Sequence, residues 1–313
     1  MPSVITAGET MVLGIPTAPG RLRHAHTLEL RIGGAESNVA IGLSRLGIAA
    51  GWISCLSSDE PGQLVLDRIR GEGVDTSRVR QIPHRPTGLF LREQIGREAR
   101  AYYYREGSAA CEMSPGCFDL DYLKSAEFLH LTGVTPALSE SCRSFTLWAT
   151  EQARENGVRV SFDVNYRSKM WAAEEAREFV EELLPLIDVL FVGDEEALVL
   201  WGKDDVGFLR ELSAEGPPEV VLKRGAEGSL ALLGNETFEQ PAFLVNEVDP
   251  VGAGDSFAAG YLAGYLWDMD VKNRLQAACA MGAYSVMTLG DYEGLPDREE
   301  LEAFSSGKKT LGR

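Results

Sequence analysis

The sequence predicts an α/β protein with a doubly wound, mostly parallel sheet, helices on both faces and a small β-sheet beside it. Short and almost continuous apolar runs recur along the chain, as expected for strands that are covered on both faces. Amphipathic segments with helical periodicity separate these runs, which is typical of successive βαβ units. In such a sheet we expect ligands to bind at the carboxyl ends of the strands.

The order of the elements follows from these two patterns. A glycine pair at 33–34 opens the first predicted helix, and Gly47 supplies its C-terminal stop. The apolar runs predict strands over residues 51–56, 128–134, 158–165, 188–192 and 219–223. The amphipathic segments predict helices over residues 35–46, 63–70, 140–156 and 174–184. A further strand is expected over residues 243–248, directly before a glycine-rich turn that opens another helix.

Two stretches do not follow the α/β pattern. Residues 10–32 and 86–105 are short and extended, and parts of them alternate between apolar and polar side chains. We expect them to form a small β layer inserted into a single domain that spans residues 1–313, with the layer acting as a lid over the ligand site. Periodicity alone allows ordinary surface hairpins equally well.

Composition excludes several classes of protein. The 313 residues are 44% hydrophobic, which excludes a disordered chain. The net charge of −17 argues against nucleic acid and anionic membranes as partners, and no run of about 18 apolar residues predicts a membrane span. The first residues lack the features of a signal peptide. The five cysteines form no C-x-x-C pair, so we expect reduced thiols in a cytoplasmic protein.

The most informative segment is Asp249-Pro-Val-Gly-Ala-Gly-Asp255, which precedes an apolar helix. Small residues at Gly252, Ala253 and Gly254 leave the free N–H groups of the helix start accessible, and these groups with the helix dipole can bind an anion. Asp255 is expected at the mouth of this cradle. Its alternative role is that of a helix cap.

Other glycine-rich nucleotide motifs are excluded. A dinucleotide fingerprint would need glycine at position 257, which is Phe257, and no G-x-x-x-x-G-K-[ST] sequence occurs. A carboxylate beside an anion cradle suits phosphoryl transfer to an alcohol. The cradle can bind the charged group that is transferred, and the carboxylate can take the proton of the acceptor hydroxyl.

Two signatures resemble those of the ribokinase-like (PfkB) carbohydrate kinases. DPVGAGDSFAAGYLAGYL at 249–266 resembles the C-terminal signature of this family, and GGAESNVAIGLSRLG at 33–47 resembles the N-terminal one. Within the family, the similarity is greatest to the 2-keto-3-deoxygluconate kinases, through segments at 85–93, 102–110, 161–171, 221–228 and 290–294. The resemblance implies a central α/β domain with a small β-sheet lid. It also implies phosphorylation of the 6-hydroxyl of this sugar acid by ATP with Mg²⁺.

The resemblance also implies roles for individual residues. Asp255 would be the general base, with Gly252, Ala253 and Gly254 as the anion hole. The residues implied to bind the sugar acid are Gly34, Asn38, Phe90, Tyr103, Arg105, Arg167, Asp255 and Asp291. Those implied to bind ATP are Asn165, Arg167, Lys223, Gly225, Gly228, Gly252, Gly254 and Cys279. Independently of the family, two arginines near one site would suit the carboxylate of an acidic sugar.

Four positions depart from the family pattern. Phe90 stands where relatives tend to have Tyr, which removes a possible hydrogen bond to the sugar. Gly193 stands in place of the amide of an N-x-x-E motif, whereas Glu196 retains the acid that would contact Mg²⁺ through water. Cys279 stands where many relatives carry Asn beside the adenine. Val251 replaces a common Thr, which leaves a monovalent-cation site near Asp249 as an open expectation.

Two alternative functions remain open from the sequence. One is a kinase of a neutral sugar such as fructose or ribose, which would not need an arginine pair. The other is a non-catalytic sugar-binding regulator on the same fold. The exposed edges of a lid sheet would favour pairing between subunits, so we also expect a homodimer or a higher assembly.

Overall fold

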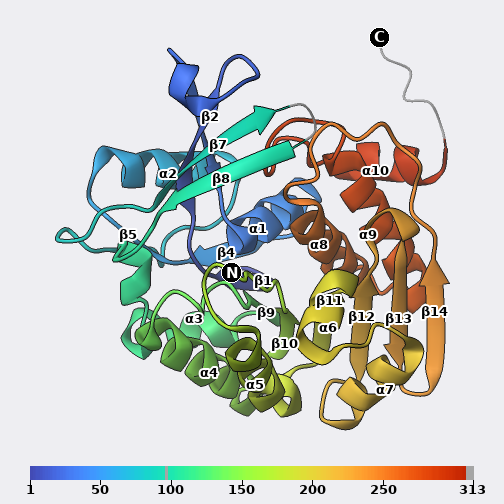
Figure 1. Cartoon of the computed structure of the whole chain (residues 1–313). Helices are drawn as coiled ribbons and strands as arrows, with labels where there is room; N and C mark the ends of the chain where they lie inside the picture. Colours follow the sequence, from blue (N-terminus) through green and yellow to red (C-terminus); the bar gives the residue numbers. More distant parts are fainter. Residues whose placement is uncertain (96–97, 308–313) are drawn as a thin grey trace.

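The central element of the computed structural model is an eight-stranded sheet within the described residues, which are 1–95 and 98–307 (Figure 1). Its strands are β1 (Val4–Ala7), β4 (Ala50–Ile53), β9 (Phe128–Thr132), β10 (Arg159–Asp163), β11 (Val189–Gly193), β12 (Glu219–Lys223), β13 (Ser229–Leu233) and β14 (Glu236–Gln240). Their spatial order is β14-β13-β12-β11-β10-β9-β1-β4. The pairs from β4 to β12 are parallel, whereas β13 and β14 add an antiparallel hairpin at one edge.

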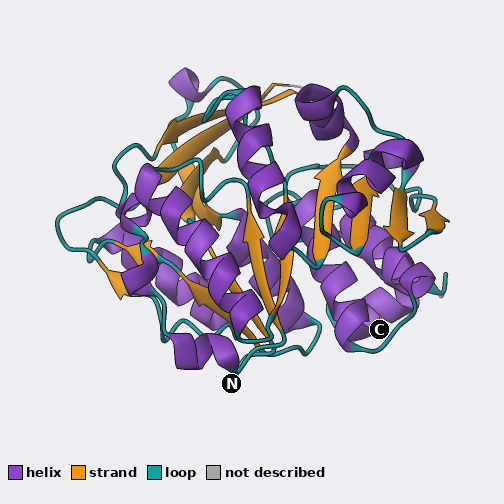
Figure 2. Ribbon diagram, turned by 90° about the horizontal axis from the view of Figure 1, so that it is seen from below, coloured by secondary structure: helices purple, strands orange, loops and turns teal. Residues whose placement is uncertain are grey.

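Helices cover both faces of this sheet, as Figure 2 shows from below. One layer contains α1 (Ala35–Arg45), α2 (Glu60–Gly71), α8 (Ala253–Leu266), α9 (Val271–Ser285) and α10 (Arg298–Ser305). The other contains α3 (Leu120–Lys124), α4 (Glu140–Glu155), α5 (Ala173–Leu183), α6 (Asp194–Trp201) and α7 (Val206–Ala214). Among the helices that the structure describes, none combines the length and apolar character needed to cross a bilayer. The predicted doubly wound α/β fold is confirmed.

Successive residues of each central strand pack into opposite layers. In β11, Val189 and Phe191 belong to the core with α1 and α8, whereas Leu190 and Val192 belong to the core with α4 and α5. All four side chains are almost fully buried. This two-sided burial is the physical reason why the strands appear as continuous apolar runs in the sequence.

A separate four-stranded sheet lies beside the α/β body, in blue and teal at the upper left of Figure 1. Its strands are β2 (Met11–Pro16), β3 (Leu28–Gly33), β7 (Leu89–Ile95) and β8 (Glu98–Tyr104), in the spatial order β3-β2-β7-β8. One face of this sheet carries a small apolar cluster of its own that includes Met11, Leu13 and Phe90. The small sheet expected from the sequence is thus present.

Several elements differ from the sequence prediction. Residues 243–248 form no strand, because the chain here runs along α9, where Val286 accepts hydrogen bonds from the amides of Val248 and Asp249. The strand expected over 51–56 is divided into β4 and β5 (Cys55–Leu56), and β5 pairs with β6 (Arg80–Gln81) instead of the central sheet. The strand β1, the hairpin β13–β14 and the helices α3, α6, α7, α9 and α10 were not predicted.

Candidate active site

A cavity of about 630 Å³, the edge cavity, lies at the carboxyl ends of the central strands and beneath the small sheet. The segments that follow β1, β9, β10 and β11 contribute to its wall, together with Lys223 at the end of β12. The residues predicted from the sequence that line it are Gly34, Asn38, Phe90, Tyr103, Arg105, Asn165, Arg167, Glu196, Lys223, Gly252, Gly254, Asp255 and Asp291. The cavity therefore occupies the place where a doubly wound fold binds ligands.

The N-terminus of α8 opens into this cavity. Gly252 is its N-cap with a φ of 79°, and a Cβ at this position would lie 2.0 Å from the carbonyl oxygen of Asp291. The amide of Ala253 donates to the carbonyl of Pro250 at 3.3 Å. Across the two described ranges, the amides of Gly252, Gly254 and Asp255 have no backbone acceptor. This turn can therefore present free N–H groups to an anion.

Asp255 lies in the first turn of α8, where its side chain is buried and borders the edge cavity. One carboxylate oxygen accepts a hydrogen bond from the Asn38 amide at 2.8 Å, and the other lies 3.5 Å from the Asn165 amide. Burial raises the pKa of Asp255 to about 6, although the hydrogen bond from Asn38 opposes the shift. A carboxylate with this pKa is suited to accept a proton near neutral pH.

An ammonium group stands next to the α8 turn. Lys223 Nζ lies 2.6 and 2.8 Å from the two carboxylate oxygens of Asp163, and 3.4 Å from where a Cβ of Gly254 would lie. Burial of Lys223 opposes its charged form, but the carboxylates of Asp163 and Glu196 outweigh this effect and raise its pKa. The cation therefore stays charged beside the free amides, as an anionic ligand would require.

Glu196 is engaged by the protein backbone. Its carboxylate accepts hydrogen bonds from the amides of Gly193 at 2.8 Å and Tyr166 at 3.0 Å, so it caps the start of α6. Burial raises its pKa, whereas nearby Lys223 lowers it. Gly193, which departs from the family motif, is thus the N-cap residue of α6, and its amide donates to the carboxylate of Glu196.

The part of the cavity beneath the small sheet contains two arginines, one with a carboxylate partner and one without. Arg105 is held by the buried carboxylate of Glu9 at 2.5–2.7 Å, and Ser108 also donates to Glu9 at 2.5 Å. Arg167 is exposed, and within the described part of the chain its side chain has no acidic partner. Of the two cations, only Arg167 lacks an ion-pair partner among the described residues, although it is near enough to Asp255 and Glu196 to favour their charged forms.

Aromatic and acceptor groups complete this part. The rings of Phe90 and Tyr103 stack with centroids 5.4 Å apart. Asn38 Oδ1 and Asp291 Oδ1 are buried, and among the described residues neither has a hydrogen-bond partner. Burial raises the pKa of Asp291 to about 7, against the influence of Arg92. Unpaired buried acceptors are costly, so these two atoms are suited to ligand hydroxyl groups.

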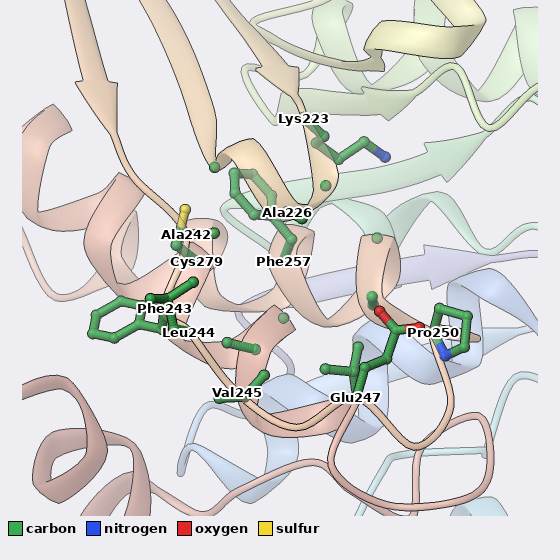
Figure 3. Close-up of a pocket in the computed structure, with 17 residues that line it drawn as sticks. Lys223, Ala226, Ala242, Phe243, Leu244, Val245, Glu247, Pro250, Phe257 and Cys279 are labelled. Carbon is green, nitrogen blue, oxygen red and sulfur yellow. The ribbon is translucent and has the colours of Figure 1, made fainter.

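A second cavity of about 330 Å³, the apolar pocket (Figure 3), adjoins the first. It is lined by Gly225, Gly228, Ala253 and Cys279 of the predicted residues, and by apolar side chains that include Phe243 and Phe257. Lys223, Pro250 and Gly254 line both cavities. An elongated ligand with an apolar ring and an anionic tail could therefore lie in the pocket with its tail at the α8 turn.

The sequence analysis did not identify three charged residues of this region. Glu9 and Asp163 hold the side chains of Arg105 and Lys223, and both lie at the carboxyl end of a predicted or observed strand. That position is a usable signal, because the ends of parallel strands converge at one edge of the sheet. Arg92, which pairs with Asp249, gave no such signal, because it lies within a strand of the small sheet.

The fold and this pair of cavities define a class of enzyme, the ribokinase-like carbohydrate kinases. A family model described as pfkB family carbohydrate kinase matches residues 1–298, and the chain belongs to this family. The resemblance found in the two signatures is confirmed.

Individual relatives agree with this assignment. The chain is 36% identical over 312 residues to a 2-dehydro-3-deoxygluconokinase of Bacillus subtilis, with 98% of this chain and 96% of the relative covered. It is 35% identical to a 2-dehydro-3-deoxygalactonokinase of Haloferax volcanii, with 92% of each covered. A ribokinase II of E. coli in complex with ATP and Mg²⁺ has a similar structure, with a TM-score of 0.90, 27% identity, and 98% and 100% of the two chains covered.

Proposed function

We propose that this protein transfers the γ-phosphoryl group of ATP to the 6-hydroxyl of 2-keto-3-deoxygluconate, which is the compound also called 2-dehydro-3-deoxygluconate. The observation that carries the proposal is the buried Asp255 carboxylate beside free helix amides, at the junction of an apolar pocket and a polar cavity. The curated relative from Bacillus subtilis, whose name refers to this substrate, supports the choice of sugar acid.

In this proposal the adenine lies in the apolar pocket and the phosphates reach the α8 turn. Gly225, Gly228 and Cys279 border the adenine, and Lys223 with the amides of Gly252 and Gly254 receives the negative charge of the transferred group. Asp255 takes the proton from the 6-hydroxyl as its oxygen attacks the γ-phosphorus, and the bond from this phosphorus to the bridging oxygen breaks so that ADP leaves. Because the donors are fixed before the reaction begins, they stabilise the charge that develops in the transition state.

The sugar acid occupies the edge cavity, with its carboxylate toward Arg167. Arg105 contributes less charge because Glu9 compensates it, but its guanidinium is fixed in place for hydrogen bonding. Asn38, Asp291 and the backbone at Gly34 bind hydroxyl groups, and the stacked Phe90 and Tyr103 cover the ligand. Arg167 also lies near the phosphates, so it can contact both substrates.

Mg²⁺ would neutralise charge on the ATP phosphates. Within the described ranges no group of three His, Cys, Asp or Glu side chains is placed to hold a metal ion. This donor set fits Mg²⁺, because the ion in such sites is bound mainly by phosphate oxygens and water with one or two carboxylates. Glu196, whose carboxylate already accepts two amides, would contact its waters.

We further propose that the chain is one functional domain in which the small sheet, within segments 10–32 and 86–105, closes over the sugar acid. Closure would exclude water and suppress ATP hydrolysis.

The outer strand β3 exposes Leu28 and Leu30, which supports pairing of this edge with a second copy. We expect a dimer in light scattering, and Leu30→Glu should shift it toward the monomer. A wild-type monomer at high concentration would contradict this assembly.

A second candidate substrate is the C4 epimer, 2-keto-3-deoxygalactonate, which the name of the Haloferax volcanii relative supports. The two acids share the carboxylate and the 6-hydroxyl, so Arg167 and Asp255 would serve both. Kinetic measurements with the two epimers decide which of them is preferred.

The proposal is tested by a coupled kinase assay over both sugar acids, fructose and ribose. We expect turnover with a sugar acid and little with the neutral sugars. Arg167→Met should raise KM for the sugar acid by about 10–100-fold, as expected for loss of a charge-assisted hydrogen bond, and Arg105→Met should raise it less. Arg78→Met, which removes an exposed arginine paired with Asp119, is the matched control.

Preference for fructose or ribose would favour the neutral-sugar kinase. Binding of a sugar acid without any turnover would favour a sugar-binding regulator. An equal effect of the Arg167 and Arg105 variants would contradict the assignment of the carboxylate to Arg167.

A further inference from the structure

A buried ion pair connects the small sheet to the segment before the α8 turn. Arg92 belongs to β7, and Asp249 precedes the turn by three residues. Arg92 Nη2 lies 2.5 Å from Asp249 Oδ2, and Nη1 lies 3.4 Å from Oδ1. Both side chains are 5% exposed, so the pair is shielded from water and salt.

The remaining acceptor capacity of Asp249 is also used. The amide of Gly290 donates to Oδ2 at 3.0 Å, and the amide of Val251 donates to Oδ1 at 3.3 Å. Each carboxylate oxygen thus has one guanidinium and one backbone donor. A buried carboxylate needs such compensation, and here the chain provides all of it from its own groups.

This pair also lies between the segments that form the reaction site. Arg92 Nη1 is 3.9 Å from Asp291 Oδ1, and the carbonyl of Asp291 contacts Gly252 so closely that no Cβ could fit there. Arg92 therefore interacts directly with the Asp249 and Asp291 segments, which contribute the anion hole and a hydroxyl-binding group in the proposed function.

We propose that the Arg92 guanidinium replaces the monovalent cation expected near Asp249, and that Arg92 is a positioning residue for the anion hole. The residues do not fit a bound K⁺ or Na⁺. Such an ion would have to displace a buried guanidinium or bind beside it against like-charge repulsion, and Val251 offers no side-chain oxygen as a ligand. Since Arg92 comes from the small sheet, its position also depends on that sheet being docked.

The first test is the cation dependence of the wild-type enzyme. Turnover is measured in chloride salts of K⁺, Na⁺ and tetramethylammonium at equal ionic strength. We expect rates that agree within about twofold, because the built-in cation is always present. A requirement of the wild-type enzyme for K⁺ or Na⁺ would overturn the proposal.

The second test is chemical rescue of Arg92→Ala. This change leaves the Asp249 carboxylate buried without its cation, and misplacement of the α8 turn should lower kcat by about 100-fold while changing KM for the sugar acid less. Millimolar ethylguanidinium should restore part of kcat, and K⁺ should do so more weakly, whereas tetramethylammonium and urea should not. Arg78→Ala, an exposed arginine, is the control that should show no rescue.

The role of Arg92 in positioning the anion hole rests on the proposed function, but a third test, thermal unfolding, does not depend on any activity. Guanidinium compounds and K⁺ at millimolar concentration should raise the melting temperature of Arg92→Ala and leave that of the wild-type protein unchanged. If no sugar is phosphorylated at all, the proposed function fails, but the melting experiment still shows whether Arg92 takes the place of a cation at Asp249. If Arg92→Ala does not fold, Arg92→Lys and the wild-type cation series take its place. Equal melting responses of variant and wild type would refute the cation replacement.

Discussion

Two charged residues of the site, Asp255 and Arg167, differ in burial and in their partners. Asp255 is buried and receives only amide hydrogen bonds, so its proton affinity is increased. Arg167 is exposed and unpaired within the described residues, so its charge remains available to a ligand. Burial therefore tunes the proposed base, whereas exposure keeps the proposed carboxylate ligand ready to bind.

Replacing Asp255 by Asn should lower kcat by about 10²–10⁴-fold, because an amide cannot take the proton of the acceptor hydroxyl. The Asn38 amide can still donate to the new side chain, so the circular dichroism spectrum should be unchanged. Near-normal turnover of this variant would remove Asp255 from the role of base.

The pH profile gives a second check on Asp255. With a pKa of about 6, the carboxylate is protonated at lower pH and cannot accept a proton. We therefore expect kcat/KM to fall as the pH decreases through about 6. The residual activity of Asp255→Asn should not show this step.

At the level of elements, the α8 turn depends on close contact between two loops. Gly252 has a φ in the left-handed region, and its Cα faces the carbonyl of Asp291. The N-terminus of α8 and the segment around Asp291 are thus fixed relative to each other. This contact sets the direction in which the free amides point.

Gly252→Ala should destabilise the protein by more than about 1 kcal/mol and lower kcat strongly, because the left-handed conformation and the contact with Asp291 both penalise a Cβ. Gly157→Ala is the matched control. Gly157 has a φ of 72° and open space around its Cβ position, so that variant reports the backbone cost alone. Thermal unfolding and initial rates of both variants measure the difference, and equal losses would argue against the loop contact.

The sequence predicted a strand best where its apolar run is also buried on both faces of the folded sheet. Residues 219–223 were predicted within the correct bounds because an apolar run at this position is buried on both faces. Residues 243–248 have a similar apolar character but lie against α9 and the apolar pocket without a partner strand, and pairing of this kind depends on tertiary context.

The candidate site shows the same limit. Motif positions such as Asp255 and Lys223 could be found from the two signatures and the strand ends. Arg92 could not, because it meets Asp249 only after the small sheet docks on the α/β body. The position of Glu9 after a strand is a signal for the site, but its pairing with Arg105 also depends on that docking.

For the whole molecule, buried acids make stability dependent on pH. Burial raises the pKa of Glu36 and Asp291 to about 7 and that of Asp255 to about 6. The folded state thus keeps protons that the unfolded state releases above about pH 4. The free energy of unfolding therefore decreases as the pH rises from about 4 toward 7. Burial lowers the pKa of His130 to about 4, which acts in the opposite direction but only below about pH 6.5.

We therefore expect a lower melting temperature at pH 8 than at pH 5.5. Glu36→Gln should reduce this difference, because it removes a buried acid of the first turn of α1 whose carboxylate accepts hydrogen bonds from Thr132 and Thr135. Glu60→Gln, which changes an exposed acid, is the control. A melting temperature that rises between pH 5.5 and pH 8 would show that other groups dominate.

The shared wall formed by Lys223, Pro250 and Gly254 has a consequence for how this scaffold can change. One side of the wall is lined by the small sheet together with segments at the carboxyl ends of the central strands, and the other is lined by the C-terminal third of the chain. Substitutions in the first group can redirect the choice of acceptor while the machinery for nucleotide use stays intact. Such a division lets new specificities evolve, or be engineered, from one inherited chemical step.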